Sequence, residues 1–198
     1  MSLLFETIQC KDGKLLNLDY HNERMNRSRL ELFRSREALS IEEYVVGTRI
    51  PLNGIYKCRV VYQTQFFTVE YVPYKMKQIN GIQIVESDTI EYKYKYSDRS
   101  GLDQLLVKAK TDEILIIKDG VVTDTSYSNI VFLDGNKWIT PADPLLKGTQ
   151  RQKLLDEGRI SESEILTHEI FGFTSLKLIN AMMTFDESPE LPIAVIRG

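Results

Sequence analysis

Residues 121–151 contain the types and spacing of side chains that most clearly suggest chemistry: an acid in apolar surroundings and a glycine-led helix start. The acid is Asp124, and the helix start is the step Gly148, Thr149 and Gln150. With glycine in front and threonine as the N-cap, such a start leaves backbone N–H groups that can bind a phosphate. Most helix starts of this kind are only capped, so plain capping is the alternative to an anion site.

A second feature is a pair of lysines in the run IEYKYKY at residues 90–96. The strict alternation predicts a strand with Lys93 and Lys95 on one face and three tyrosines on the other. For both lysines, an exposed strand lysine is the non-functional alternative.

The elements that must position these residues follow from hydrophobic periodicity and turn residues. Strands are predicted at residues 3–9, 14–18, 55–62, 66–74, 82–85, 90–96, 113–117, 121–122, 130–133, 138–140, 176–179 and 192–196. Helices are predicted at residues 19–33, 40–47 and 98–110, and after Gly148 with an end at Gly158. Asp119-Gly120 is the clearest hairpin turn, and it places Asp124 on the strand that follows.

The helix predicted at 19–33 is expected to begin at Asp19 as its N-cap and to bury an apolar stripe. That stripe consists of Met25, Leu30, Leu32 and Phe33. Its arginines are Arg24, Arg27 and Arg29, for which a solvated helix face is the simplest reading. The helix at 40–47 has Ser40 as its N-cap, with Glu43 placed for a capping box.

The composition indicates a globular protein with room for one large or two small domains in 198 residues, 42% hydrophobic and 27% charged. The net charge of −3 gives no reason to expect nucleic acid or an anionic membrane as a partner. Cys10 and Cys58 are expected to be buried free thiols. The first residues do not have the pattern of a signal peptide, and no stretch has the length of a membrane span. We therefore expect a cytoplasmic protein, and no metal site is predicted.

Several short matches occur in a fixed order along the chain. They are His21-x-x-Arg24, Lys95 with Arg99, Asp124 followed by Ser128-Asn129, Thr140-Pro141, Leu146-x-Gly148-x-x-Arg151, and Asn180-Ala181. This set resembles the class IV aminotransferases, the fold-type IV pyridoxal phosphate (PLP) enzymes. They include branched-chain aminotransferases, D-amino acid aminotransferases and aminodeoxychorismate lyases. The resemblance runs from about Phe5-Glu6-Thr7 to Pro192 and is most specific in residues 124–151.

The resemblance implies a catalytic role for Lys95, which would bind the PLP aldehyde as a Schiff base and move the proton at the substrate Cα. A lysine amine becomes a nucleophile when its pKa is lowered, which Arg99 and the cofactor could do. Lys93 is the rival on the same face, and Lys95 is preferred because only it has the lysine-to-arginine spacing of the lyase branch. It implies that Asp124 pairs with the pyridine nitrogen and keeps the ring protonated, so that the ring can accept electrons. The family usually has Glu at that position, and Asp is one methylene shorter.

The remaining implied contacts concern the cofactor phosphate and the local fold. Arg24 would bind the phosphate bidentately. Further phosphate contacts would come from Gly148, Thr149, Gln150, Asn180 and Ala181. Asn129 would fix the local hairpin, and His21 would be structural.

Residues 179–183 and the spacing from Lys95 to Arg99 resemble the aminodeoxychorismate lyases more than the transaminases. Such a lyase releases pyruvate from 4-amino-4-deoxychorismate and leaves 4-aminobenzoate, a folate precursor. Arg59 is the nearest candidate to hold a substrate carboxylate. The alternatives are an aminotransferase for branched-chain or D-amino acids, and a non-catalytic family member suggested by Asp124 and a shortened N-terminus.

The expected fold is α+β (α/β) with two domains. A small N-terminal α/β domain is predicted at residues 1–81, and a larger β-rich domain with helices at 82–198, with PLP in the cleft between them. The family's fold also implies a homodimer that acts on a small amino substrate.

Overall fold

In this computed structural model, which describes residues 2–198, the chain divides into two compact units. Unit 1 contains the chain up to Met76 together with Tyr94–Asp98, and unit 2 contains Lys77–Lys93 and Arg99–Gly198. The sequence predicts a domain boundary at residue 81, and the first division between the two units lies between Met76 and Lys77. The short segment Tyr94–Asp98, predicted in the second domain, clusters with unit 1.

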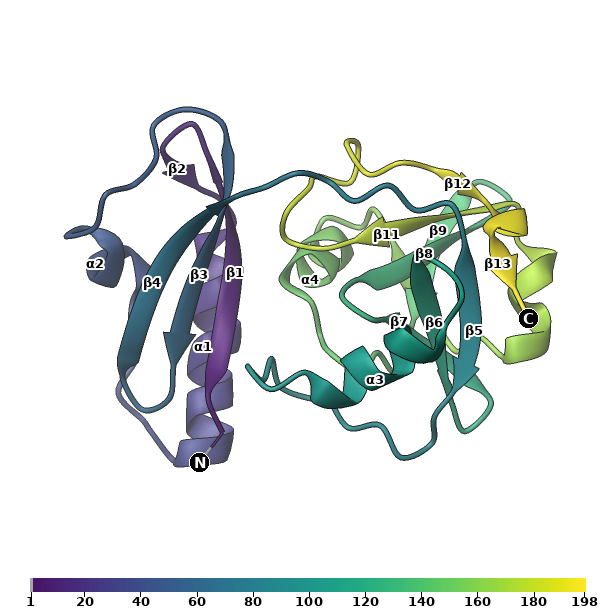
Figure 1. Cartoon of the computed structure of the whole chain (residues 1–198), viewed down its shortest axis with the longest axis horizontal. Coiled ribbons are helices and arrows are strands. Elements are labelled where there is room, and N and C mark those ends of the chain that lie inside the picture. Colours follow the sequence, from purple (N-terminus) through teal and green to yellow (C-terminus); the bar gives the residue numbers. More distant parts are fainter. Residues whose placement is uncertain (1) are drawn as a thin grey trace. The chain divides into compact units, whose positions relative to one another are not determined.

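Unit 1 is an antiparallel sheet in the order β2-β1-β3-β4 with helices packed on one face. Its elements are β1 (Leu4–Lys11), β2 (Lys14–Leu15), α1 (Leu18–Phe33), α2 (Ile41–Val45), β3 (Ile55–Tyr62) and β4 (Phe66–Pro73). Figure 1 shows α1 running along the sheet formed by β1 and β3. The predicted hairpin with its turn at residues 63–65 is confirmed. Cys10 and Cys58 are confirmed as buried free thiols in the core of this unit.

Helix α1 differs from its prediction in both its start and its buried face. Its N-cap is Asn17 in a left-handed conformation without a side-chain bond, so Asp19 is not the cap. Of the predicted apolar stripe, Met25 is buried and Leu32 and Phe33 pack against the core, whereas Leu30 is 48% exposed. The buried positions are mostly polar: His21, Arg24, Met25, Ser28 and Arg29. The expectation of solvated arginines is therefore wrong for two of the three, because Glu6 and backbone carbonyls supply partners inside.

Helix α2 begins as predicted, because the Ser40 side chain accepts a hydrogen bond from Glu43 N at 3.3 Å. This bond satisfies one of the free N–H groups at the helix start.

Within the described residues, unit 2 contains two further sheets, in the orders β13-β5-β6-β7 and β10-β9-β8-β11-β12 (Figure 1). Their strands are β5 (Ile82–Glu86), β6 (Glu113–Lys118), β7 (Val121–Thr125), β8 (Asn129–Asp134), β9 (Lys137–Pro141), β10 (Ser161–Ser163), β11 (Ser175–Ile179), β12 (Leu191–Pro192) and β13 (Ile196–Arg197). The helices are α3 (Ser100–Lys108), α4 (Thr149–Asp156), and the 3₁₀ turns η1 (Thr167–Gly172) and η2 (Ile193–Val195). The two hairpins predicted in residues 113–140 are confirmed.

The two sheets of unit 2 share a core, in which Leu115 of β6 clusters with Phe132 of β8 and Leu178 of β11. Helix α4 covers the opposite face of the second sheet, because its Leu154 clusters with Val131, the residue of β8 that points the other way. Asp124, Asn129 and the start of α4 are thus fixed by strands and a helix with buried apolar faces.

Three predicted strands are wrong in extent. The strand predicted at residues 14–18 is limited to β2, because α1 begins at Leu18. Residues 90–96 form bends instead of a strand, with one bridge between Tyr96 and Leu4. The last predicted strand, 192–196, is interrupted by η2. In residues 2–198, no helix is long and apolar enough to cross a membrane.

Candidate functional site

In unit 1, Lys95 lies on a short segment that adds to the edge of β1. Phe5 N donates to Lys95 O at 3.0 Å, and Ser97 N donates to Leu3 O at 2.8 Å. Strand β2 pairs only with the last two residues of β1, so it does not occupy this edge. The backbone bonds fix the position of Lys95, although the segment is too short to form a strand.

The side chains of Lys95 and Arg59 contact the same aromatic ring. Lys95 Nζ lies 4.9 Å from the centroid of the Phe5 ring, and Arg59 Cζ lies 4.7 Å from it. Arg59 also donates to the exposed Glu70 carboxylate at 3.3 Å. Lys95 is predicted to bind the cofactor aldehyde, and Arg59 a substrate carboxylate. Their shared contact with Phe5 brings these two side chains together within unit 1.

Arg24 is buried against a carboxylate that the sequence analysis did not single out. Arg24 Nε donates to Glu6 Oε1 at 3.0 Å, and its Nη2 pairs with Glu6 Oε2. His21 Nδ1 lies 2.6 Å from Glu6 Oε2. Glu6 is fully buried and Arg24 is 6% exposed. The signal that could have identified Glu6 is its charge on the face of β1 whose other residues, Leu4, Ile8 and Cys10, are apolar and buried.

These contacts determine the charges in the cluster. Burial alone would raise the pKa of Glu6, but the Arg24 guanidinium and the bond from His21 outweigh burial and lower that pKa to about 2. Burial lowers the pKa of His21, and the nearby charges of Arg24 and Lys95 lower it further, against the opposing effect of Glu6. Glu6 is therefore ionised at neutral pH. His21 is neutral, and its Nδ1–H donates to Glu6.

In unit 2, the Asp124 carboxylate is held at both oxygens. Asn129 Nδ2 donates to Asp124 Oδ1 at 2.7 Å, and Leu146 N donates to Asp124 Oδ2 at 2.9 Å. Burial raises the pKa of Asp124, and the bonds from Leu146 and Asn129 together with the Arg151 charge only partly offset it, leaving the pKa at about 7. Asp124 is thus a buried carboxyl group that changes protonation near neutral pH.

The start of α4 carries the predicted anion-binding step. Gly148 is the N-cap, so the prediction that Thr149 caps the helix is wrong by one residue, and no side-chain bond caps this end. The first helical residues, Thr149 and Gln150, are 4% and 5% exposed. Four N–H groups at a helix start have no partner within the helix, and they favour an anion.

The predicted turn at Asn180 lies beside the start of β8. Strands β8 and β11 are antiparallel, with Asn129 opposite Ile179, so the residues just outside the two strands meet. Asn180 Nδ2 donates to Ser128 Oγ at 2.9 Å, and Met182 N donates to Asn180 Oδ1 at 2.8 Å. Ala181 is held in the turn that these bonds close, so Asp124, the start of α4 and the 180–182 turn all lie around the start of β8.

Two other polar residues hold the loop between β7 and β8. Arg99 Nη2 donates to Ser126 O at 2.8 Å, and Ser126 N donates to Glu113 Oε1 at 2.9 Å. Glu113 is fully buried, and its other carboxylate oxygen has no hydrogen-bond partner within the described residues. Glu113 was not predicted as a functional residue, because in the sequence it is only the first residue of the strand predicted at 113–117.

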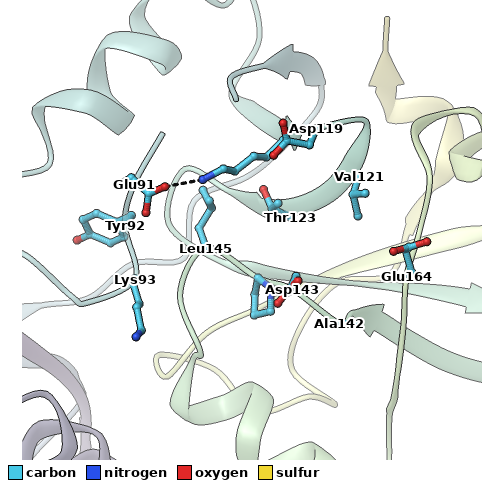
Figure 2. Close-up of a pocket in the computed structure, with 12 residues that line it drawn as sticks. Glu91, Tyr92, Lys93, Asp119, Val121, Thr123, Ala142, Asp143, Leu145 and Glu164 are labelled. Atoms are coloured by element: carbon cyan, nitrogen blue, oxygen red, sulfur yellow. Dashed lines mark hydrogen bonds and ion pairs between the residues drawn. The ribbon is translucent and has the colours of Figure 1, made fainter. Parts of the chain in front are cut away.

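A cavity of about 350 Å³ in unit 2 has none of the predicted cofactor residues in its lining. Figure 2 draws the residues that line it. Lys93 is among its lining residues, as are Lys118 and Glu91, which form an ion pair with Nζ and Oε1 2.6 Å apart. The lining residues include neither Asp124 nor the first residues of α4. Within residues 2–198, no group of His, Cys, Asp and Glu side chains is arranged to hold a metal ion.

Comparison with known proteins identifies relatives along the whole chain. A family model for amino-transferase class IV matches residues 95–185. An uncharacterized protein of Haemophilus influenzae is 41% identical over 183 residues, covering 90% of this chain and 97% of that protein. The crystal structure of a candidate 4-amino-4-deoxychorismate lyase from Haemophilus somnus 129PT is 34% identical, with a TM-score of 0.85, and the match covers 93% of this chain and 98% of that one.

A more distant solved structure shares the fold. It is the PLP-bound form of a hypothetical aminotransferase from Mycobacterium tuberculosis, at 17% identity and a TM-score of 0.72, covering 96% of this chain and 80% of that one. Members of the matched family typically use PLP. The 34% identical Haemophilus somnus protein matches nearly the whole chain, and the family model matches residues 95–185. The chain therefore belongs to the class IV aminotransferases.

Proposed function

We propose that this protein is a PLP-dependent 4-amino-4-deoxychorismate lyase that releases pyruvate and 4-aminobenzoate. The observation that carries the proposal is the donor set. Unit 1 contains Lys95 and Arg24, whose guanidinium is held by the Glu6 carboxylate. Unit 2 contains the start of α4 beside the buried Asp124. The Haemophilus somnus protein, 34% identical over nearly the full chain, supports the lyase branch.

The residues fit the three functional groups of PLP. A primary amine suits its aldehyde, an arginine and a helix start suit its phosphate, and a carboxylate suits its protonated ring nitrogen. When bound, PLP supplies an electron sink that stabilises negative charge at the substrate Cα. The pKa of Asp124, about 7, is compatible with a carboxyl group that shares a proton with a pyridine nitrogen at neutral pH.

Each residue then has a stated task. Lys95 would bind the aldehyde covalently, with release of water, and would move the proton at the substrate Cα. Arg24 binds the phosphate, together with donors of Gly148, Thr149 and Gln150 and of the Asn180-Ala181 turn. Asp124 pairs with the ring nitrogen. Arg59 binds a substrate carboxylate, and its place over the same Phe5 ring as Lys95 supports that task.

An aminotransferase acting on branched-chain or D-amino acids is the second candidate, because the same cofactor residues would serve it. The fold shared with the aminotransferase of Mycobacterium tuberculosis is compatible with this activity. A non-catalytic family member is the third candidate, suggested by Asp where the family usually has Glu. We further propose that the protein acts as a homodimer.

The first experiment adds PLP to the purified protein, reduces it with borohydride, and maps the modified peptide. We expect visible absorption that free PLP does not show, and a reduced adduct on Lys95. Lys95→Ala should abolish the adduct, whereas Lys93→Ala is the matched control from the same run and should keep it. An adduct on Lys93 would move the catalytic assignment, and the absence of any specific adduct would refute the enzyme.

Substrate assays then separate the first two candidates. The lyase predicts equimolar pyruvate and 4-aminobenzoate from 4-amino-4-deoxychorismate without an added oxoacid. The aminotransferase predicts turnover of an amino acid that depends on 2-oxoglutarate or pyruvate as acceptor.

A further inference from the structure

The amide of Asn129 joins the Asp124 carboxylate to the loop that leads into α4. Its Nδ2 donates to Asp124 Oδ1 at 2.7 Å and to Leu146 O at 2.9 Å. Leu146 N in turn donates to Asp124 Oδ2 at 2.9 Å. Both donor positions of one side-chain amide are therefore used, and the three groups form a closed ring of hydrogen bonds.

This ring links residues that are distant in sequence. Asn129 begins β8, and Leu146 lies 17 residues later, two residues before the N-cap of α4. The reading of Asn129 as a residue that fixes its local hairpin is thus too narrow. Its side chain is 6% exposed and Asp124 is 5% exposed, so neither can replace a lost partner with bulk water at low cost.

The oxygen of the same amide explains the glycine at the N-cap. Gly148 has φ −70° and ψ 145°, a conformation open to any residue, so backbone strain does not require glycine here. A Cβ built on Gly148 would overlap Asn129 Oδ1. Glycine at this position therefore lets the backbone before α4 lie directly against the amide.

We infer that Asn129 is a positioning residue that sets the start of α4 for binding a phosphate group and aligns Asp124 with it. The inference rests on the proposed function, in which that helix start receives the phosphate of PLP. Asn129 acts through Asp124 and Leu146 and requires no contact with the cofactor. We call the set Asp124, Asn129, Leu146 and Gly148 the Asn129 clamp.

The first readout is the ratio of the affinities for PLP and for pyridoxal, which lacks the phosphate. Both are measured by absorbance titration of the full-length protein. Asn129→Ala should lower the ratio about tenfold, the size expected for the loss of one well-placed hydrogen bond to the binding site, while pyridoxal affinity changes less. Asn136→Ala, in the exposed turn between β8 and β9, is the matched control and should leave the ratio unchanged.

The second readout is a double-mutant cycle on melting temperature, which requires no cofactor. Gly148→Ala alone should lower the melting temperature by several degrees, because the new methyl group displaces the Asn129 amide from its bonds. In the Asn129→Ala background the same methyl group has space, so the double variant should melt close to Asn129→Ala alone. If Asn129→Ala does not fold, Gly148→Ala still tests the clamp through the affinity ratio, which should fall.

Three results would overturn the inference: an unchanged ratio in both single variants, an equal loss of PLP and pyridoxal affinity, or additive melting shifts in the cycle. A wild-type protein that binds neither compound would refute the proposed function instead. In that case the melting cycle alone decides whether the clamp exists.

Discussion

Replacing Glu6 by Gln tests the buried cluster of unit 1 most directly. The variant keeps the shape of the side chain and removes the charge that faces Arg24. Glu6 is fully buried and Arg24 is 6% exposed, so the arginine would be left in the interior without its anionic partner. Breaking a buried ion pair in this way typically costs about 3–5 kcal/mol.

The pKa of Glu6 gives a second measure of the same cost. Its fall from 4.5 to about 2 corresponds to about 3–4 kcal/mol, at about 1.4 kcal/mol per pKa unit. Because the folded-state pKa is depressed, this stability is present above pH 4.5 and is lost as the pH falls towards 2. Glu6→Gln should therefore lose about 3–4 kcal/mol at pH 7, and its stability should depend less on pH below 4.5.

The assay is urea unfolding followed by far-UV circular dichroism at pH 7, 4.5 and 3. Glu23→Gln is the matched control, because Glu23 lies on the exposed side of α1 and its ion pair with Arg27 is open to solvent. That variant should change stability by less than about 0.5 kcal/mol. If Glu6→Gln is as stable as wild type at pH 7, or if both proteins lose stability equally between pH 4.5 and 3, the account of the cluster is wrong.

Three further outcomes follow from unit 2. The pKa of Asp124 is raised to about 7, so its contribution to stability is complete below its unfolded-state pKa and is lost as the pH rises through 7. Asp124→Asn should therefore reduce the dependence of the free energy of unfolding on pH. This is measured by Trp138 fluorescence in urea from pH 5.5 to 8.5. Gly120→Ala should cost about 1 kcal/mol in calorimetry because φ is +79° with open space around it, whereas Gly47→Ala, also in open space, should cost less. Leu154→Ala should cost about 2–5 kcal/mol in the same measurement because it leaves a cavity under α4.

The parts of the fold that the sequence predicts correctly are those with local causes. Asp119 and Gly120 have φ values of +52° and +79°, and this turn chemistry is visible in the dipeptide itself. Ser40 caps α2 through a bond that reaches three residues. Strand alternation and turn residues were sufficient to locate both hairpins that carry the residues of unit 2.

The parts that sequence analysis missed depend on partners far along the chain. The burial of Arg24 requires Glu6, 18 residues away, and that of Arg29 requires the carbonyl of Thr64, 35 residues away. The alternation at residues 90–96 satisfied the strand pattern, but the partner of the segment is the short open edge of β1. The candidate lysine was predicted from its spacing, and its contact with Phe5 required the structure.

The position of Tyr94–Asp98 has a consequence for dividing the chain into fragments. These five residues belong to unit 1 although both flanking segments belong to unit 2, so the chain passes from one unit to the other at three points. A fragment ending at Met76 would contain the sheet and α1 but not Lys95. Co-expression of two polypeptides cut at that point would return Lys95, the proposed nucleophile, to β1 only if residues 94–98 of the second polypeptide pair with β1. Recovery of a borohydride-stable label on Lys95 in such a split protein would report this pairing.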